Sequence, residues 1–286
     1  MIPKNFDIDK HIERWFAEDV GNGDHSSLAA IPTHAERKVR LIIKDNGVLA
    51  GVELAKYIFN YVDSSFVFTQ FIEDGTLVKY GDIAFIVEGK AQKLLTTERL
   101  VLNLMQRMSG IATKTAQFVK LTEGTNAKLL DTRKTTPGLR QIEKWATRIG
   151  GGYNHRMGLY DMIMLKDNHV DFCGSIEKAV TQTKAYLKSN MLDIKIEVEV
   201  RNLNELQQVL DTKQVDRVMF DNFTPQEVIK ALEVVRDSGT KIETEASGGI
   251  NLKTIRAYAE TNVDYISVGA LTHSYNSLDM SLKAFI

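Results

Sequence analysis

The second half of the chain repeats one pattern, and this pattern limits the possible fold more than any other feature of the sequence. From residue 127 onward, short runs of β-branched and apolar residues return with centres roughly 22 to 35 residues apart. Repeated β-α units of this length predict a parallel sheet, and six units suggest a barrel, with a doubly wound open sheet as the alternative. The six runs are Ala127–Leu130, Met162–Leu165, Ile194–Val200, Arg217–Phe220, Ile242–Ala246 and Tyr265–Val268.

The segments between most of these runs have helical periodicity. Apolar residues recur there at three- and four-residue spacing, which is typical of amphipathic helices that cover a sheet. No Gly-x-Gly-x-x-Gly pattern follows a run and no Walker A pattern occurs, so nothing in the sequence indicates a dinucleotide or ATP site. The expected helices are Ser175–Leu187, Leu203–Leu210, Pro225–Val235 and Leu252–Glu260.

The first hundred residues favour a mixed architecture instead. Short β-rich runs are separated there by turn signals such as Asp45-Asn46-Gly47. We interpret this part as a small α/β sandwich, followed by a further helix that begins near Thr97. Strands are expected at Lys38–Lys44, Gly47–Ala50, Phe66–Ile72 and Ile83–Glu88, and helices at Ile8–Val20 and Gly51–Val62.

Composition excludes several classes of protein. Apolar residues make up 43% of the 286 residues and the net charge is −1, so the chain has the content of a globular core and no field that points to nucleic acid or a membrane surface. Cys173 is the only cysteine, which excludes an intrachain disulfide and fits a reducing cytoplasm. Residues 1–6 lack a signal-peptide pattern, and no window has the apolar length of a membrane span. We therefore expect a soluble, cytoplasmic protein.

Polar residues follow nearly every predicted strand of the second half. Because the carboxyl ends of parallel strands meet at one edge of a sheet, these residues are expected to form a site there. For a single strand the ordinary explanation is that it reaches solvent, but six strands with different polar ends favour a site. The segments concerned are Asp131–Lys134, Lys166–His169, Glu197 with Glu199, Asp221-Asn222, Ser247–Gly249 and Gly269.

Positive charge gathers in the first part of this region. Residues 127–169 contain eight Lys or Arg against four Asp or Glu, a local excess of +4 in a chain of net charge −1. Arginine binds carboxylates and phosphates through two parallel hydrogen bonds, and lysine adds a compact charge, so the expected ligand carries several negative charges. Arg140, Lys144 and Arg148 recur every four residues and are interpreted as a solvated helix face. The basic residues at strand ends or in a glycine-rich loop are Arg133, Lys134, Arg156 and Lys166.

Acidic residues and a glycine turn complete the expected site. Glu199 and Asp221 lie on neighbouring predicted strands. Two carboxylates in one cleft suit Mg²⁺ binding, acid-base chemistry or stabilisation of a developing cation. The alternative is a buried ion-pair network with nearby basic residues. Ser247-Gly248-Gly249 precedes a predicted helix, and main-chain N–H groups at such a turn bind phosphate. Glycines also end strands for steric reasons, so the turn alone is a weak indication.

A series of motifs resembles the quinolinate phosphoribosyltransferases, the type II phosphoribosyltransferase family. The motifs follow the family's order over about 175 residues. Two departures are small: Tyr153 stands where a basic residue is common, and Thr244 where an aliphatic one is expected. The motifs are Glu98-Arg99 with Asn103, Ser109–Ala112, Asp131–Gly138, Gly150–Gly152 with Asn154-His155-Arg156, Lys166–His169, Glu197–Glu199, Asp221–Phe223, Glu245–Ile250 and Gly269–Thr272.

The resemblance implies a fold, an assembly and a reaction. It implies an N-terminal α/β sandwich domain over residues 1–105, an incomplete, open TIM-like α/β barrel over 106–270, and a C-terminal segment, 271–286, that packs back on the first domain. It further implies a homodimer or larger homo-oligomer in which the partner completes each active site. The implied reaction joins quinolinate to 5-phosphoribosyl 1-diphosphate and yields nicotinate mononucleotide, pyrophosphate and CO₂, requires Mg²⁺ and belongs to NAD biosynthesis.

The resemblance also implies a role for individual residues. From sequence alone Arg99 is a helix cap or surface residue and His155 a local hydrogen-bonding residue, so both roles come from the family. The catalytic residues would be Lys134, Glu199 and Asp221, with Mg²⁺ held through the diphosphate near the two acids. Quinolinate would be bound by Arg133, Lys134, His155, Arg156, Lys166 and the partner subunit's Arg99. Phosphoribosyl diphosphate would be bound by Lys134, Lys166, Glu199, Asp221, Ser247, Gly248, Gly249 and Gly269.

Three other functions remain open from the residues. A related barrel enzyme would act on another anionic heterocycle. A Schiff-base aldolase would use Lys166 or Lys134 with an acid nearby. A non-catalytic protein would bind an anion in the same pocket.

Overall fold

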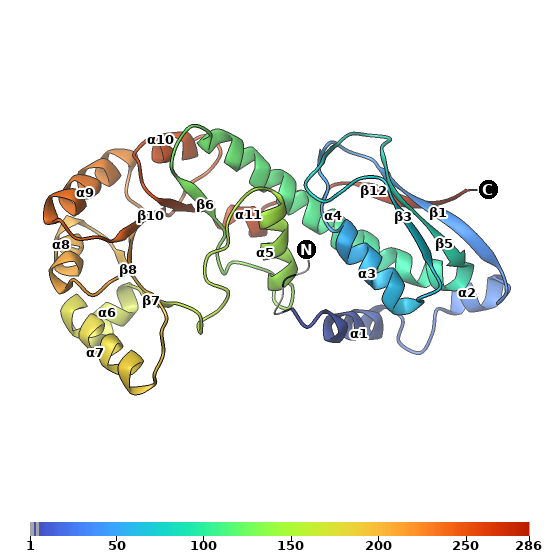
Figure 1. The fold of residues 1–286 in the computed structure, drawn as a ribbon, viewed down its shortest axis with the longest axis horizontal. Coiled ribbons are helices and arrows are strands. Elements are labelled where there is room, and N and C mark those ends of the chain that lie inside the picture. The colour runs from blue at the N-terminus through green and yellow to red at the C-terminus, as the bar shows by residue number, and fades with distance from the viewer. Residues whose placement is uncertain (1–2, 4–5, 286) are drawn as a thin grey trace. The chain divides into compact units, whose positions relative to one another are not determined.

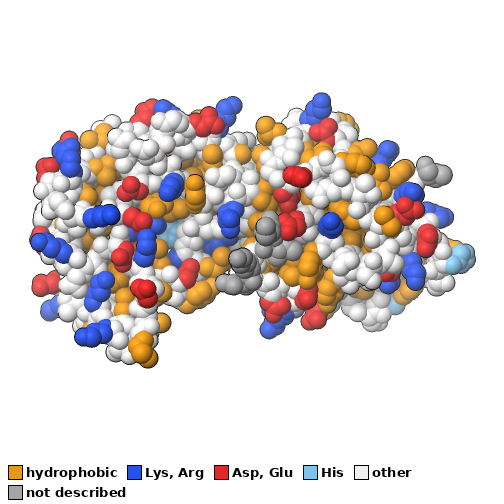
Figure 2. All heavy atoms as spheres, viewed as in Figure 1, with side chains coloured by type: hydrophobic (Ala, Val, Ile, Leu, Met, Phe, Trp, Pro, Cys, Tyr) orange, Lys and Arg blue, Asp and Glu red, His pale blue; other side chains and the backbone are white. Residues whose placement is uncertain are grey.

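The computed structural model describes residue 3 and residues 6–285, which form two compact units. The first unit comprises residues up to 116, 136–151 and 274 onward; the second comprises 117–135 and 152–273. Figure 1 shows their helices and strands. None of the described helices contains a stretch long and apolar enough to cross a membrane. On the face shown in Figure 2, positive and negative side chains are interspersed, in keeping with the near-neutral net charge.

The first unit is built on a four-stranded antiparallel sheet in the order β12-β1-β5-β3. Along β1, Val39, Leu41 and Ile43 are buried at alternate positions, because successive side chains of a strand point to opposite faces. β12 pairs with β1, so residues 280–285 belong to this sheet. The strands are β1 (Glu36–Ile43), β3 (Val67–Gln70), β5 (Ile83–Lys90) and β12 (Met280–Phe285), with a small separate pair, β2 (Gly47–Val48) and β4 (Leu77–Val78).

The helices of the first unit, apart from the short second one, contribute buried apolar side chains to the same core as this sheet. The predicted sandwich elements are confirmed, but the helix expected near Thr97 begins at Ala91, directly after β5. Its first turns contain strong helix formers, and Leu94 is buried there, so packing extends the helix toward its amino end. The helices are α1 (Ile8–Asp19), α2 (His25–Ala30), α3 (Val52–Val62), α4 (Ala91–Thr122) and α5 (Arg140–Ile149).

Helix α5 corrects one prediction. Arg148 is exposed and Arg140 half-buried, but Lys144 is fully buried, so the solvated helix face predicted for these residues is wrong. The helix buries every residue from 142 to 147, because it packs on more than one side. Within this unit, the buried Glu143 accepts hydrogen bonds from Arg107 Nε at 2.9 Å and from the main-chain N–H of Thr136 at 3.2 Å.

The second unit is a six-stranded parallel sheet in the order β6-β11-β10-β9-β8-β7. Each predicted β-rich run of this half contains one strand, which confirms the βα reading. β6 and β7 are the two edges and do not pair with each other, so the barrel is open and incomplete. The strands are β6 (Lys128–Leu130), β7 (Ile163–Leu165), β8 (Ile196–Val200), β9 (Arg217–Asp221), β10 (Glu243–Ser247) and β11 (Tyr265–Ser267).

The outer face of this sheet carries the helices, as Figure 1 shows for α7 to α10. Along β8, Ile196, Val198 and Val200 are fully buried in the apolar core with the helices, which turns Glu197 and Glu199 to the opposite, inner face. The predicted helix Leu252–Glu260 is shorter than expected. The helices are α6 (Asp167–Cys173), α7 (Ile176–Ser189), α8 (Leu203–Thr212), α9 (Pro225–Ser238), α10 (Ile255–Ala259) and α11 (Ala270–His273).

Candidate active site

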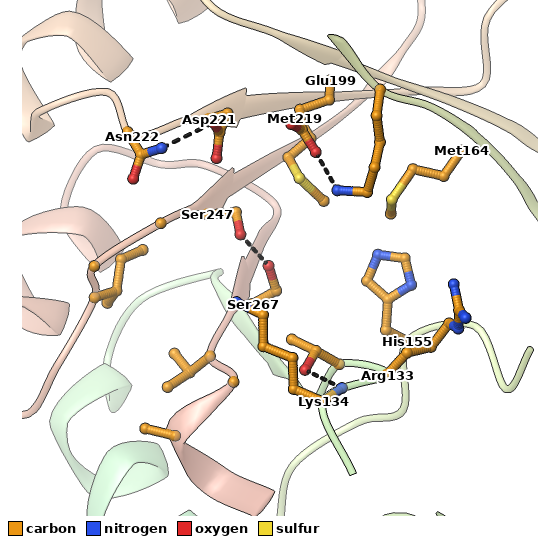
Figure 3. Close-up of a pocket in the computed structure, with 18 of the residues that line it drawn as sticks. Arg133, Lys134, His155, Met164, Glu199, Met219, Asp221, Asn222, Ser247 and Ser267 are labelled. Carbon is orange, nitrogen blue, oxygen red and sulfur yellow. Dashed lines mark hydrogen bonds and ion pairs between the residues drawn. The ribbon is translucent and has the colours of Figure 1, made fainter. Parts of the chain in front are cut away.

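A cavity of about 720 Å³ opens where the parallel strands of the second unit end. Its size lies within the range of small-molecule sites. Figure 3 shows side chains from several strand ends converging on it. The lining residues are Thr132, Arg133, Lys134, His155, Arg156, Met164, Lys166, Glu199, Met219, Asp221, Asn222, Ser247, Gly248, Gly249, Ile250, Ser267, Val268, Gly269, Ala270 and His273. The structure thus brings together every residue to which the family resemblance gave a role except Arg99, which is exposed on α4 of the first unit. Of the polar residues expected at the strand ends, Asp131, Asp167–His169 and Glu197 do not line the cavity.

The loop after β6 brings Arg133 and Lys134 to the cavity. Thr272 Oγ1 donates to the carbonyl of Lys134 at 2.8 Å, and the main-chain N–H of Lys134 donates to Thr132 Oγ1 at 3.0 Å. These bonds hold the main chain, whereas the amine of Lys134 has no hydrogen bond or ion pair to any residue that the structure describes. Its charge is therefore available to an anionic ligand.

A second basic segment lies before β7. The fully buried carboxylate of Asp131 accepts hydrogen bonds from the main-chain N–H of His155 at 2.9 Å and from Asn154 Nδ2 at 2.6 Å. The guanidinium of Arg156 donates to the carbonyl of Met162 at 3.2 Å. Asp131 thereby fixes the loop that presents Arg156, a task that the sequence analysis did not assign to it.

The acidic side of the cavity comes from β8 and β9. Glu199 Oε2 lies 2.6 Å from Lys166 Nζ, as the dashed line in Figure 3 marks. Asp221 accepts from Asn222 Nδ2 at 2.8 Å and forms no ion pair among the described residues. Glu199 thus shows part of the alternative ion-pair arrangement, but Asp221 is left as an acceptor for a ligand or a cation.

The turn Ser247–Gly249 closes the cavity on the far side from the basic loops. Gly248 and Gly249 have φ of +97° and +63°, which favours glycine at both positions. A Cβ on Gly248 would lie 2.9 Å from the main-chain nitrogen of Asn222, so this one position packs too closely for a side chain. The expected helix start after Ile250 is wrong, since α10 begins only at Ile255 and has five residues. Any phosphate binding here would rely on the N–H groups of the turn itself.

A buried charge cluster lies beneath the cavity floor. His155 Nε2 lies 3.1 Å from Glu197 Oε2 and 3.4 Å from Glu245 Oε2, and Arg217 Nη1 lies 3.1 Å from Glu245 Oε2. All four side chains are at most 8% exposed. Arg217 also bonds Glu243 at 3.0 Å and stacks on Tyr265, with its guanidinium carbon 4.0 Å from the ring centroid.

The cluster shifts the acidity of its members. Burial raises the pKa of Glu197 to about 7, and the carboxylate of Glu245 beside it adds to the effect. For His155 two effects on the pKa oppose each other: burial lowers it, and the carboxylates of Glu197 and Glu245 near Nε2 raise it. The main-chain N–H of Arg156, however, donates to His155 Nδ1 at 2.6 Å, which requires a lone pair on that nitrogen. We therefore favour a neutral ring protonated on Nε2, with a proton retained on the carboxylate pair.

The sequence analysis did not assign this cluster a function. A usable signal was present, because Glu197 precedes Glu199 by two residues and therefore shares its face of the strand. Glu245 stands in the same relation to Ser247. Only the sheet order, which puts β10 and β8 on either side of β9, shows that these two acids meet.

These features define a class of enzyme. A cavity at the carboxyl edge of an open parallel α/β barrel combines four cationic side chains, two carboxylates and a glycine turn, which suits the transfer chemistry of anionic substrates. Residues 24–109 match the N-terminal domain of quinolinate phosphoribosyl transferase, and residues 111–283 match its C-terminal domain. The chain belongs to the quinolinate phosphoribosyltransferase family.

Individual relatives extend the match over nearly the whole chain. Quinolinate phosphoribosyltransferase [decarboxylating] 2b, mitochondrial, of Nicotiana tabacum is 42% identical over 97% of this chain and 82% of its own. The probable nicotinate-nucleotide pyrophosphorylase [carboxylating] of Bacillus subtilis is 40% identical over 96% of this chain and 92% of its own. The crystal structure of NadC from Streptococcus pyogenes has a TM-score of 0.91 and 37% identity, and covers 100% of both chains.

Proposed function

We propose that the cavity of the second unit is where this chain transfers the phosphoribosyl group of 5-phosphoribosyl 1-diphosphate to quinolinate. The reaction is the one for which the family is named: it proceeds with decarboxylation and gives nicotinate mononucleotide, pyrophosphate and CO₂, a step of de novo NAD biosynthesis. The observation that carries the site is the meeting of a cationic group and an acidic pair at one sheet edge. The transferase therefore replaces the aldolase and the anion-binding protein as the function of this fold.

The cationic side is proposed to bind quinolinate. The two carboxylates of this substrate match the guanidinium groups of Arg133 and Arg156 and the free amine of Lys134. Lys166 stands between this group and the acids, since its amine reaches Glu199. His155 lies on the same side of the cavity as Met164 in Figure 3 and contributes the edge of its ring.

The opposite side is proposed to bind phosphoribosyl diphosphate. The turn of Ser247, Gly248 and Gly249, with Gly269 beside it, would hold the 5′-phosphate through main-chain N–H groups. Glu199 and Asp221 would face the ribose. Lys134 and Lys166 would lie near the diphosphate, because their amines enter the cavity between the two substrate regions.

Charge complementarity explains how these residues would promote the transfer. Departure of diphosphate leaves positive charge on the anomeric carbon, and Glu199 and Asp221 place negative charge near that position. Carboxylate oxygens are also the ligands that Mg²⁺ prefers, so the same two residues fit a magnesium ion held mainly through the diphosphate. The ion would neutralise charge on the leaving group.

Decarboxylation needs little further help from the protein. Once the ring nitrogen is bonded to ribose, it carries a positive charge that accepts the electron pair left by CO₂ on the adjacent carbon. The carboxylate lost is the one next to the nitrogen, so the other must stay bound. Arg133 and Arg156 would then serve to hold the ring in position rather than to react with it.

The proposed reaction has a direct test. Purified protein is expected to release pyrophosphate and CO₂, and to form nicotinate mononucleotide, only when quinolinate, phosphoribosyl diphosphate and Mg²⁺ are all present. Nicotinate in place of quinolinate should give no product, and EDTA should stop a reaction that added Mg²⁺ restores. Equal turnover of nicotinate would overturn the assignment of quinolinate as the substrate. Full activity in EDTA would overturn the proposed requirement for Mg²⁺.

We further propose a homodimer in which Arg99 of each chain completes the partner's cavity. The exposed position of Arg99 on α4 supports this, because an exposed side chain can contact a second chain. A cytoplasmic location is proposed on the strength of the single cysteine.

Mixed dimers test the sharing of sites. Arg99→Ala and Lys166→Ala chains should each be inactive alone. Coexpressed in equal amounts, they should recover about a quarter of wild-type activity, since half of the dimers are mixed and one of their two sites is intact. Steady-state assay of the mixture measures this, and the heterodimer purified from it should have about half of wild-type activity, from its one intact site. Absence of recovery in a verified heterodimer would mean that Arg99 acts within its own chain.

A further inference from the structure

Burial of the charge cluster beneath the cavity floor costs free energy of folding. Burying an ionised group such as Arg217, or a polar one, loses solvation free energy that a pair of apolar residues of similar volume would not lose. Arg217, Glu197, Glu245 and His155 are nevertheless all buried in the second unit. Such an arrangement calls for a purpose other than stability.

The contacts of the imidazole indicate that purpose. Nε2 faces Glu197 and Glu245 below, and Nδ1 accepts the main-chain N–H of Arg156 at 2.6 Å. Nδ1 therefore accepts a hydrogen bond within the protein, and Nε2 lies within ion-pair distance of both carboxylates. A ring held in this way has one orientation, and it fixes the main chain at the residue whose guanidinium enters the cavity.

The cluster continues outward through charged partners. Arg217 bonds both Glu245 at 3.1 Å and Glu243 at 3.0 Å, and Glu243 in turn bonds Lys195 at 3.0 Å near the surface. Tyr265 covers the guanidinium of Arg217. The position of Glu245 under the ring thus depends on Arg217, which does not line the cavity.

We propose that Arg217 is a positioning residue for quinolinate: through Glu245 and His155 it sets the place of Arg156 in the cavity. Glu197 faces the same ring nitrogen, Nε2, at 3.1 Å. The inference rests on the proposed function of the cavity as the quinolinate site. It concerns the cationic side first, because the turn Ser247–Gly249 is joined to the cluster less directly, along β10 and through Ser267, which contacts Glu245 and bonds Ser247 Oγ at 2.9 Å.

Three variants test the proposal by separating the two substrates. Arg217→Met is expected to raise the KM and the Kd of quinolinate by about tenfold or more, since displacing a positioning contact by about 1 Å is enough for such losses. The KM of phosphoribosyl diphosphate and kcat at saturation should stay within about threefold, as expected when only ground-state binding is lost. Arg217→Lys, which keeps the charge, should recover most of the affinity. If the single variant does not fold, the double variant Arg217→Met/Glu245→Gln replaces it, because it also removes the buried carboxylate charge that Arg217 pairs with. The same two KM values are then measured.

Asp216→Asn is the matched control. Asp216 is next in sequence, accepts from the main-chain N–H of Ile196 at 2.7 Å at the amino ends of β8 and β9, and does not line the cavity. It should lower the midpoint of thermal unfolding without changing either KM. An equal rise in both KM values for Arg217→Met would overturn the proposal, because it would mean general damage to the fold.

Two further measurements distinguish a failure of the positioning role from a failure of the cavity assignment, and both from a metal site. Arg133→Ala tests the cavity itself: if it weakens quinolinate binding while Arg217→Met does not, the positioning role fails and the proposed function stands. If neither weakens it, the assignment of the cavity fails. His155, Glu197 and Glu245 also have ligand atoms within 4.8 Å of one another. A stoichiometric divalent metal found by elemental analysis of the purified protein would therefore overturn the proposal in favour of a metal site.

Discussion

Lys134→Ala is expected to lower kcat by about 10²- to 10³-fold, the loss typical of removing one charge that stabilises a transition state. The amine of Lys134 lines the cavity and has no partner among the described residues, so its charge is held for the substrates. It lies where quinolinate and the diphosphate would both reach it. Steady-state kinetics with each substrate varied would measure the effect.

Lys128→Ala is the control for this variant. Lys128 lies on β6, in the same segment of chain, but its amine stands over the rings of Tyr153 and Tyr265 at 5.7 and 5.8 Å from their centroids. It removes the same charge from outside the cavity and should leave kcat within about twofold, since a distant exposed charge is screened. Near-wild-type turnover of Lys134→Ala would withdraw its catalytic assignment.

Gly248→Ala is expected to raise the KM of phosphoribosyl diphosphate by about tenfold or more, because a misplaced binding group costs that much. The added Cβ would lie 2.9 Å from the main-chain nitrogen of Asn222 and would force the turn open. The KM of quinolinate should change by less than about threefold, since only the phosphate side is disturbed. Titration calorimetry with each substrate would show the same separation.

Gly174→Ala provides a control with nearly the same backbone. Gly174 has φ of +95° against +97° for Gly248, but a Cβ there meets nothing within 4 Å. It should lose about 1 to 2 kcal/mol of stability from the left-handed conformation alone, with neither KM altered. If Gly248→Ala behaves like Gly174→Ala, the turn does not bind the phosphate.

The strand order explains why the sequence predicts the residues of the cavity but not the buried charge cluster that supports them. Strand ends can be read one at a time, because a polar residue after a β-branched run lies at the carboxyl edge wherever the strand stands in the sheet. Arg133, Lys166 and Asp221 were found in this way. The meeting of Glu197 with Glu245 depends on the order β10-β9-β8, which local periodicity does not contain.

The burial of charged side chains is the second feature that the sequence pattern did not predict. The four-residue spacing of Arg140, Lys144 and Arg148 is that of a solvated helix face, yet Lys144 is fully buried. A charged residue is buried when tertiary neighbours supply partners, as Arg107 does for the adjacent Glu143. The helix start expected at the glycine turn failed for a related reason, since the main-chain turn there is set by its packing against Asn222 rather than by helix propensity.

By itself the sequence determined the βα repeat of the second half, the mixed architecture of the first and the motifs of the family. These depend on periodicity and on short segments, which are local properties of a chain. The tertiary structure alone decided that Lys144 is buried and that Arg217 reaches His155 through Glu245. These facts depend on which distant segments share a surface, and that is settled by packing and by the pairing of buried charges.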